Sequence, residues 1–307
     1  MFNFTLKQLR YVEAAGRLGS ISAAAQELNI SQSSITAAIG ALEQEIGYDL
    51  FMRTPARGIS ATPSGVETLS LIRRFIEQSR HFESEMRSVD GDATGSVRIA
   101  CYATAAPSLL PPIFKSYSKR FPRMSIKLLE GDMEDVLTFL EAGEADLAFT
   151  YSEAIRARNH FEPLFTAPPY AIIGSDDPLC EQSSVSLKEL SSRPMIVLDL
   201  AHTREYFSGM FEDLGLAPNI VHSSRSVEIT RALVAGGFGF SILNIRPPDY
   251  HTDQNRYRIL PISDTLRIPE FGIATQSSVR QPSMVTTFVD HCMTLKLDGV
   301  FNDLIVH

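Results

Sequence analysis

The segment 22–43 carries the most specific chemical pattern in the sequence. It meets the steric needs of a helix-turn-helix, with small Ala25 where two helices touch, Asn29 at a left-handed turn and apolar Ile35 beneath the second helix. Ser31 would cap that second helix, whose N-terminal end is the part that enters a DNA major groove. We therefore expect contacts to double-stranded DNA from Ser31, Gln32, Ser33, Ser34 and Thr36. A plain alanine-rich helical hairpin is the alternative that this pattern leaves open.

A second group of polar residues follows the ends of strands predicted in the rest of the chain. In two-lobed α/β domains, ligands bind where strand ends and helix N-termini of both lobes face a cleft. Arg204 could clamp a carboxylate through two hydrogen bonds, while Asp132 would accept from an amine or hydroxyl. An ion pair of Arg204 with Glu205 or Asp199 is the open alternative. We expect a site for a small polar metabolite with a carboxylate, formed by Thr104, Asp132, Tyr151, His202, Thr203, Arg204 and Asn244.

The predicted DNA-contacting residues must be positioned by short helices that are separated by turn signals. Apolar residues at helical spacing predict a three-helix cluster over residues 5–47. Apolar stretches at 50–52 and 59–61 flank a turn rich in Pro, Arg and Gly, which predicts a small hairpin. Thr62 before Pro63 predicts the start of a long helix, because a capping residue precedes one whose missing N–H costs nothing at the first helical position.

The long helix, expected over residues 63–90, bears a narrow apolar stripe. Its members recur at steps of three, four and six: Val66, Leu69, Ile72, Ile76, Phe82 and Met86. Such a stripe either pairs with the same helix of a second copy or packs on the helix's own domain. The segment 90–96 that follows, DGDATGS, has the composition of a linker.

Beyond the linker, apolar strands alternate with helices, which predicts an α/β domain over residues 95–307 with a largely parallel sheet. Strands are expected at 97–101, 125–129, 146–150, 170–174, 195–198, 220–222, 238–243 and 271–275, and helices at 109–120, 133–141, 203–214, 226–235 and 283–295. The domain is long for one sheet, so we expect two lobes. Crossings near Phe165 and Ile268 would give lobe 1 over about 95–165 and 269–307, and lobe 2 over about 166–268.

Several patterns argue against catalysis. Cys101, Cys180 and Cys292 are odd in number and far apart, so we expect reduced core residues rather than disulfides or a zinc site. His202 and His222 lack metal-ligand spacing, and the sequence contains no nucleophile motif. The run 235–240, AGGFGF, leads into a strand and so lacks the strand-then-helix spacing of a dinucleotide loop. We therefore expect neither an enzyme nor a bound cofactor or metal.

Composition narrows the class of protein further. Of the 307 residues, 44% are hydrophobic, enough for about two domains with cores, and no apolar run is long enough to span a membrane. The sequence shows no secretory signal, so we expect a cytoplasmic protein. The formal net charge is -8, yet residues 1–62 hold five basic and five acidic residues, so this charge lies in the remainder. An acidic remainder opposes indiscriminate coating of DNA but not specific binding.

The N-terminal motifs resemble the winged helix-turn-helix of the LysR-type transcriptional regulators. The resemblance rests, in chain order, on Gly19, Ser20, Ser22, Ala24, Ala25, Leu28, Ser31, Gln32, Leu42, Glu43, Leu50, Phe51, Arg53, Thr62 and Gly65. It implies a DNA-binding domain over 1–62, a linker and dimerisation helix over 63–90, and a two-lobed effector domain over 95–307, similar to periplasmic solute-binding proteins. The implied partners are operator DNA, a small-molecule effector, further copies in a homodimer or homotetramer, and RNA polymerase. The family commonly places a ligand-contacting hydroxyl near Thr104.

Three residues depart from the family pattern. Ser33 stands where a Pro is common, and Ala37 and Gly40 stand where relatives usually carry Arg. Residues 31–46 thus contain no Lys or Arg, and phosphate contacts fall to the helix N-terminus, the hydroxyls, and Arg53 and Arg57 of the wing. We therefore expect a shallow salt dependence and an affinity that relies on avidity. The alternative is a binding protein or enzyme that uses the α/β domain alone.

Overall fold

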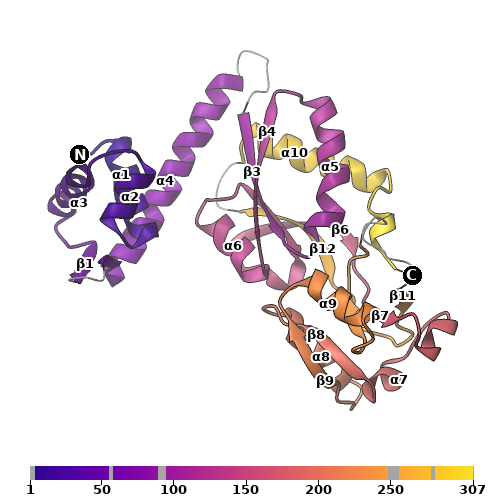
Figure 1. Ribbon diagram of the computed structural model, residues 1–307. Helices are drawn as coiled ribbons and strands as arrows, with labels where there is room; N and C mark the ends of the chain where they lie inside the picture. Colours follow the sequence, from indigo (N-terminus) through magenta and orange to yellow (C-terminus); the bar gives the residue numbers. More distant parts are fainter. Residues whose placement is uncertain (1–3, 55–57, 89–94, 248–255, 278–280, 307) are drawn as a thin grey trace. The chain divides into compact units, whose positions relative to one another are not determined.

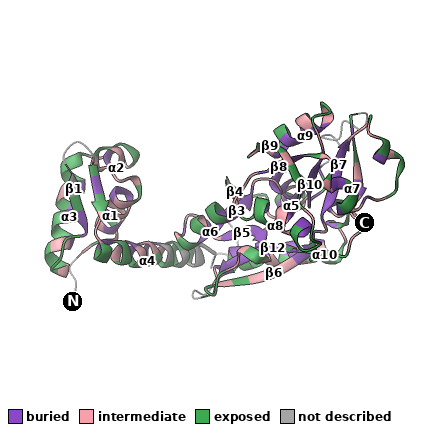
Figure 2. Ribbon diagram, turned by 90° about the horizontal axis from the view of Figure 1, so that it is seen from below, coloured by how far each residue is buried: buried purple, intermediate pink, exposed green. Residues whose placement is uncertain are grey.

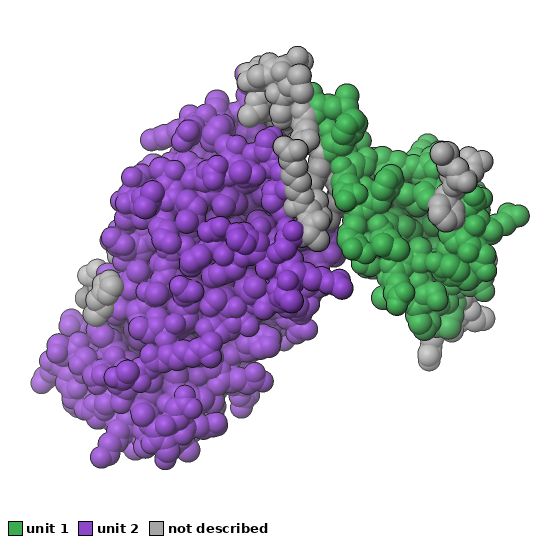
Figure 3. All heavy atoms as spheres, turned by 180° about the vertical axis from the view of Figure 1, so that it is seen from behind, with its two compact units in different colours: residues 1–92 green, residues 93–307 purple. Residues whose placement is uncertain are grey.

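The structure, a computed structural model, describes residues 4–54, 58–88, 95–247, 256–277 and 281–306. The chain divides into two compact units, Met1–Asp92 and Ala93–His307 (Figure 3). Each unit has its own hydrophobic core, visible as buried segments of the ribbon (Figure 2). No helix in the described residues is both long and apolar enough to cross a membrane.

The first unit is a helix cluster followed by a hairpin and a long helix (Figure 1). Its elements are α1 (Leu6–Leu18), α2 (Ile21–Glu27), α3 (Gln32–Ile46), β1 (Phe51–Thr54), β2 (Gly58–Ala61) and α4 (Pro63–Ser88). β1 and β2 pair antiparallel, with Phe51 opposite Ala61. The predicted helix cluster, hairpin and long helix are therefore confirmed.

Capping side chains explain where the helices of this unit begin. Thr5, Ser20, Ser31 and Thr62 cap α1, α2, α3 and α4 by accepting hydrogen bonds from backbone N–H groups of the first turn. Asn29, between α2 and α3, has a φ of 53°, the left-handed conformation expected at this turn. Ile35, on the inner face of α3, is completely buried. The helix-turn-helix pattern is confirmed.

Two close backbone approaches fix the hairpin and α4 against the helices. Ile59 N donates to Gly19 O at 3.0 Å, and a Cβ on Gly58, whose φ is +86°, would lie 2.5 Å from that oxygen. At the start of α4, a Cβ on Gly65 would lie 2.1 Å from Leu50 O. Because these distances are too short for any side chain, glycine is required at both positions.

The apolar stripe of α4 is divided between buried and exposed residues. Three members pack in the core of the first unit: Leu69, Ile72 and Ile76. Three others are exposed: Val66, Phe82 and Met86. The middle of the stripe therefore packs on the helix's own unit, whereas its two ends do not.

The second unit contains two lobes. The sheet of the first lobe has the order β4 (Met124–Gly131), β3 (Gly95–Tyr102), β5 (Leu147–Tyr151), β12 (Glu270–Gln276) and β6 (Asn159–Thr166). β3 runs parallel to β4 and β5, whereas β12 runs antiparallel to both β5 and β6. The expectation of a largely parallel sheet thus holds only for β4, β3 and β5, because β12 belongs to the return of the chain from the second lobe.

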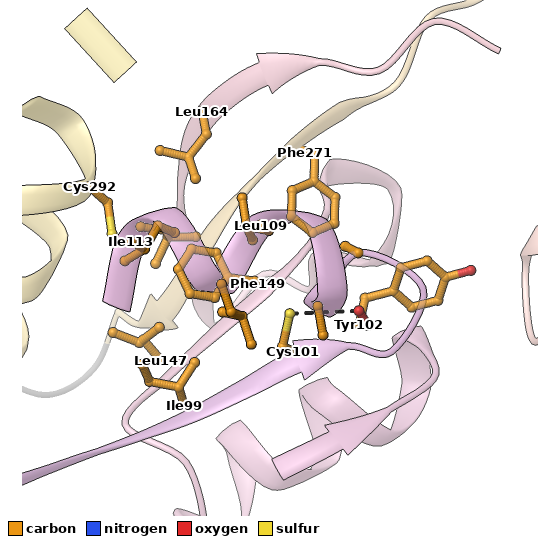
Figure 4. Close-up of a cluster of buried hydrophobic side chains, with 14 of the residues drawn as sticks. Ile99, Cys101, Tyr102, Leu109, Ile113, Leu147, Phe149, Leu164, Phe271 and Cys292 are labelled. Atoms are coloured by element: carbon orange, nitrogen blue, oxygen red, sulfur yellow. Dashed lines mark hydrogen bonds between the residues drawn. The ribbon is translucent and has the colours of Figure 1, made fainter. Parts of the chain in front are cut away.

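Helices cover both faces of this sheet. α5 (Ala106–Arg120) and α10 (Ser283–Leu297) pack on one face, and α6 (Met133–Glu141) packs on the other. Alternation along β3 produces the two faces, since Ile99 and Cys101 pack with α5 and α10 while Ala100 packs with α6. Figure 4 shows the first of these cores, in which Leu109 of α5 lies near Phe149 of β5.

The second lobe contains two short sheets joined by a bridge between Met195 and Phe240. β7 (Tyr170–Gly174) lies between β10 (Ser241–Leu243) and β11 (Tyr257–Pro261) and is antiparallel to both. β8 (Pro194–Leu198) is parallel to β9 (Asn219–Ser224). Helices α7 (Leu187–Ser191), α8 (Thr203–Glu212) and α9 (Val227–Ala235) contribute to its cores.

In the described residues the chain passes between the lobes twice. It leaves the first sheet after β6 and enters β7 at Tyr170, and it returns between the end of β11 at Pro261 and the start of β12 at Glu270. The sequence pattern does not predict β6, β11 or α7, because both strands contain a Pro and charged residues and α7 has only 5 residues. Short 3-10 helices lie at Ser152–Ala154, Pro178–Glu181 and Asn302–Leu304.

Candidate functional site

The N-terminal end of α3 presents polar residues to solvent. Ser31, Gln32, Ser33 and Ser34 are exposed, and Thr36 is half-buried. The Ser31 hydroxyl accepts from Ser34 N at 3.2 Å and lies 2.8 Å from the hydroxyl oxygens of Ser33 and Ser34. Thr36 Oγ1 donates to Gln32 O at 3.0 Å. The predicted DNA-contacting residues of this segment thus gather at one helix end, where N–H groups and the helix dipole favour phosphate.

One exposed face of α3 carries no charged residue. Ser33, Ala37, Gly40 and Gln44 follow at steps of four, three and four, the spacing of one helix face, and all are exposed. Among the described residues, no side chain or neighbouring element lies within 4 Å of a Cβ built on Gly40. Such a face can approach a DNA groove closely. The opposite face packs in the core through Ile35, Ala38, Ile39 and Leu42.

The arginines of residues 1–62 fall into two groups. Arg10 and Arg17 form ion pairs with acidic residues of the same unit, at 3.8 and 3.6 Å. Arg53 belongs to β1, but its side chain lies outside the described part of the chain, and so does the whole of Arg57. Phosphate contacts from Arg53 and Arg57 therefore stay a prediction.

Glu43 positions the hairpin relative to α3. Its Oε1 accepts from Leu50 N at 2.7 Å and from Phe51 N at 3.2 Å, where the chain enters β1. On the other side of the hairpin, Thr62 Oγ1 donates to Asp49 O at 2.8 Å. These bonds give two motif residues, Glu43 and Thr62, a structural role at the base of the wing.

A cavity of about 60 Å³ lies between the two lobes of the second unit. Five of the seven residues predicted for the ligand site line it: Thr104, Tyr151, His202, Thr203 and Asn244. Apolar lining comes from both lobes and includes Met133, Leu198, Phe207, Val227, Leu243 and Ile245. The cavity is thus assembled from strand ends of the first lobe and from α8, α9 and β10 of the second.

Tyr102, which directly follows the first predicted strand of the α/β domain, links the lobes at this cavity. Its phenol oxygen lies 2.9 Å from Thr203 Oγ1, and both residues are buried. Burial raises the pKa of the Tyr102 phenol, so the hydroxyl stays protonated and able to donate. The ring meets Tyr151 edge-on, with ring centroids 5.6 Å apart. At the chain crossing, Asn244 Nδ2 donates to Ala167 O at 2.7 Å.

Asp132 and Arg204 lie outside the cavity lining. Asp132 caps α6 by accepting from two backbone N–H groups at 3.0 Å, and its Oδ2 lies 3.4 Å from Arg225 Nη2 of the other lobe. Arg204 Nη1 lies 3.3 Å from Asp199 Oδ2, which matches the ion pair that the sequence left open. Because Thr203 lines the cavity, the next residue of the helix points about 100° away from it.

The lining also includes three residues that the sequence pattern does not suggest: Glu153, Tyr206 and Arg231. Arg231 is only 5% exposed, and its Nη1 lies 2.7 Å from Glu228 Oε1. A signal for it does exist, because Arg231 shares the buried face of α9 with Val227 and Val234, where the spacing calls for an apolar residue. A charged residue at such a position indicates a buried polar site.

The cysteines are free thiols. Cys101 and Cys292 are buried in the core drawn in Figure 4, and Cys180 is partly buried. Burial raises the thiol pKa of all three, which suppresses the reactive thiolate form. Cys101 and Cys292 belong to the hydrophobic core of the first lobe, and Cys180 packs against a core of the second.

Known proteins resemble the chain over most of its length. The family model of the LysR substrate binding domain matches residues 90–295, and that of the bacterial regulatory helix-turn-helix protein, lysR family, matches residues 6–66. The HTH-type transcriptional regulator CysB of Burkholderia cenocepacia is 27% identical over 293 residues, which cover 93% of this chain and 92% of CysB. The regulator cbl of Escherichia coli is 26% identical over 261 residues, covering 82% and 81% of the two chains.

Solved structures agree with these matches. HinK, a LysR family transcriptional regulator from Pseudomonas aeruginosa, is 30% identical with a TM-score of 0.62, over 95% of this chain and 98% of HinK. Full-length OxyR C199D from Pseudomonas aeruginosa has a TM-score of 0.74 at 22% identity, over 94% and 98% of the two chains, and so shares the fold. The chain belongs to the LysR family, as a DNA-binding transcriptional regulator, not an enzyme, with a helix-turn-helix and an effector-binding domain.

Proposed function

We propose that the cavity between the two lobes binds a small polar metabolite bearing a carboxylate, and that this metabolite acts as the regulator's co-inducer. The observation that carries the proposal is the origin of the lining, since Thr104 and Tyr151 come from the first lobe and Thr203 and Asn244 from the second. A ligand held by both lobes favours their closed arrangement and shifts the population toward it. The two chain crossings supply the hinge for this motion.

The proposal assigns a part of the task to each segment. Residues 1–62 bind DNA, residues 63–90 form the dimerisation helix, and residues 95–307 bind the effector with lobes over about 95–165 plus 269–307 and about 166–268. The helix-turn-helix match over residues 6–66 and the division between Asp92 and Ala93 support these limits. DNA contacts come from Ser31, Gln32, Ser33, Ser34, Thr36, Arg53 and Arg57. Effector contacts come from Thr104, Tyr151, His202, Thr203 and Asn244, with Asp132 and Arg204 at the margin.

A second copy of the chain is the proposed partner of α4. The large apolar side chains that α4 exposes include four that are between 51% and 64% exposed, besides Val66: Leu71, Phe75, Phe82 and Met86. Their spacing of four, seven and four residues puts them on one side of the helix, beside the side that packs in the core. Paired helices of a homodimer would bury this side, and two dimers would form a homotetramer.

The remaining partners follow from regulation at a promoter. Double-stranded operator DNA is the site of action, and RNA polymerase is the enzyme whose recruitment the regulator would change. Both place the protein's work in the cytoplasm. The effector reaches DNA binding by changing how the two helix-turn-helix units of a dimer are spaced.

Gel retardation with upstream intergenic DNA tests the DNA-binding half of the proposal. Full-length protein should retard one specific fragment in excess unrelated DNA. Gln32→Ala should lower that affinity roughly 10- to 100-fold, because a bidentate base contact contributes about 1–3 kcal/mol. Gln26→Ala, at an exposed position of α2, is the matched control and should keep most of the affinity. Equal affinity of the wild type for upstream and unrelated DNA would contradict the proposal.

Binding of the proposed co-inducer is tested on protein purified under native conditions. Small molecules released by denaturation and identified by mass spectrometry should include a carboxylate that, when added back, raises the thermal midpoint and changes retardation of the upstream fragment. A released molecule that binds but leaves retardation unchanged would contradict its role as co-inducer.

A further inference from the structure

Arg231 is a buried cation in the wall of the cavity. It lies on α9 and is 5% exposed. It lines the cavity together with Leu243, the last residue of β10, and Asn244, which follows it. Burying a guanidinium is unfavourable unless its charge and its five N–H donors find partners. The hydrogen-bond and charge partners of Arg231 therefore indicate whether this side chain stabilises the fold or binds a ligand.

The described residues satisfy Arg231 only in part. Nη1 lies 2.7 Å from Glu228 Oε1, but the Glu228 side chain is 52% exposed and so pairs with Arg231 from the solvent side. Arg231 Nε is buried and has no hydrogen-bond partner in the described part of the chain. The guanidinium also interacts with the Tyr170 phenol through its charge and a side-chain hydrogen bond, which partly offset the rise that burial causes in the pKa of this phenol. The Tyr170 hydroxyl itself donates to Ile245 O at 2.8 Å. One donor of a buried cation is thus left without an acceptor.

The charges elsewhere in the lining do not balance this cation. Glu153 is the acidic residue of the lining, and its Oε1 lies 3.6 Å from Arg267 Nη2. His202 is the other basic residue, and its side chain is 60% exposed. The hydroxyls of Tyr102 and Thr203 bond to each other across the lobes. Within the described lining, Arg231 is therefore the buried positive charge that a ligand entering the cavity would meet.

We propose that Arg231 is the anion anchor of the cavity and that its ligand is a small monoanion, with one carboxylate or sulfonate group on a short apolar body. The inference rests on the proposed effector role of the cavity and moves the anchoring charge from Arg204 to Arg231. The acidic group accepts a charged hydrogen bond from the guanidinium. The apolar body packs on Val227, Leu243 and Met133.

The size of the cavity limits the ligand. A cavity of roughly 150 Å³ admits benzene, whereas this one measures about 60 Å³. A ligand of only a few heavy atoms fits between the lobes as they stand, and a larger one requires them to part. A second charge on the ligand would have no buried cation to meet in the described lining. A short aliphatic monoanion fits both limits better than a dicarboxylate.

Thermal unfolding of the full-length protein tests the proposal, with sodium propanoate and sodium methanesulfonate as charged probes and propanamide as the uncharged control. We expect the charged probes to raise the unfolding midpoint, and propanamide at equal concentration to leave it unchanged. Arg231→Gln should weaken binding of the charged probes roughly 10- to 100-fold, as loss of a charged hydrogen bond does. Arg258→Gln, an exposed residue of the same lobe outside the lining, is the matched control and should bind them like the wild type.

Glu228→Gln keeps the test decisive if Arg231→Gln fails to fold. Removing the competing carboxylate should tighten binding of propanoate, because Glu228 and the ligand share one guanidinium. Three results would overturn the proposal: no charged probe stabilises the wild type, propanamide stabilises it as much as propanoate, or Arg231→Gln and Glu228→Gln both respond like the wild type. In the last case the ion pair with Glu228 is purely structural.

The same samples separate this inference from the proposed function. Fluorescence anisotropy with upstream intergenic DNA reports the DNA half, whose proposed contacts all lie in residues 1–62. Specific DNA binding without any response to the anions would overturn the anion site alone. Anion binding that depends on Arg231 but leaves DNA affinity unchanged would support the site and contradict the co-inducer role.

Discussion

The exposed face of α3 and the wall of the cavity place charge in opposite ways. Ser33, Ala37, Gly40 and Gln44 give α3 an exposed face without charge, although its partner DNA is a polyanion. The wall of the cavity instead buries Arg231, although the ligand proposed for the cavity is small. An uncharged helix face gains specificity from shape and hydrogen bonds, whereas a buried cation gains it from one complementary charge. The α3 face thus lacks a charge that would favour every DNA sequence, whereas the cavity wall contains the charge that we propose selects one class of ligand.

The largest expected effect comes from burying a charge in α3. Ile35→Asp should destabilise the first unit by at least about 3 kcal/mol, because its carboxylate would have no partner in the core. Ala37→Asp, two positions along on the exposed face, should change stability by less than about 0.5 kcal/mol. Hydrogen exchange of the α1–α3 amides in the full-length protein measures both changes. Equal destabilisation by the two variants would contradict the assignment of faces.

A charge added to the exposed face sharpens the comparison. Ala37→Arg should strengthen DNA binding and steepen the slope of log affinity against log salt by about 0.9, the contribution of one phosphate contact. The same gain should apply to upstream and unrelated DNA, so specificity falls. The wild-type slope should be shallow, and one that corresponds to eight or more phosphate contacts would contradict the uncharged interface.

Within the second unit, the bond between Tyr102 and Thr203 tests whether the lobes are coupled at the cavity. Tyr102→Phe should weaken the contact between the lobes by about 1 kcal/mol, the usual contribution of one hydrogen bond. Thr203→Val should cost little more once Tyr102 is Phe. A double-mutant cycle on hydrogen exchange near the cavity measures this coupling. Strictly additive effects would mean that the hydroxyls do not act together.

Substitutions of two glycines in the first unit distinguish effects on its stability from effects on how closely α3 approaches DNA. Gly40→Ala should stabilise the first unit by roughly 0.5–1 kcal/mol, because the added methyl meets open space in a helix interior. Gly65→Ala should destabilise it, because its Cβ would meet Leu50 O at 2.1 Å. Urea unfolding measures both. If Gly40→Ala is more stable yet binds DNA more weakly, close approach of α3 is needed for affinity.

The smallest expected effect concerns a buried group that carries no charge. His291 is 6% exposed, neither ring nitrogen has a partner in the described residues, and its pKa is lowered by burial and then by Arg120. Below a pH of about 6.5 the unfolded chain takes up a proton that the folded protein resists, so stability falls as the pH drops. Urea unfolding at pH 7.5 and 5.5 should show a smaller loss for His291→Leu than for the wild type. An equal loss would exclude His291 as its source.

Sequence reasoning reached further for the first unit than for the second. Ala25, Asn29, Ser31 and Ile35 act within one short segment, so their spacing alone predicts the helix-turn-helix. The sheet of the first lobe depends on β12, which arrives from more than a hundred residues beyond β5. Its antiparallel direction reflects how the chain returns between lobes, and no local pattern encodes that path.

The cavity shows the same limit. Strand ends were a sufficient guide to Thr104, Tyr151 and Thr203, because strand ends of an α/β lobe face the cleft. They give less help with charged residues, since Arg204 follows a strand end but pairs with Asp199, whereas Arg231 lies inside α9 and lines the cavity. Prediction of the charged residues that line a cleft therefore requires the buried faces of helices as well as the ends of strands.

Fluorescence anisotropy of full-length protein on its upstream intergenic DNA, with and without saturating propanoate, is the most direct test of the coupling between the two units. The wild type should change its DNA affinity by at least about fivefold on adding propanoate, within the usual range of allosteric coupling. Arg231→Gln should bind the DNA like the ligand-free wild type and show no such change. An unchanged affinity in the wild type, or the same change in both proteins, would contradict the coupling of the cavity to DNA through Arg231.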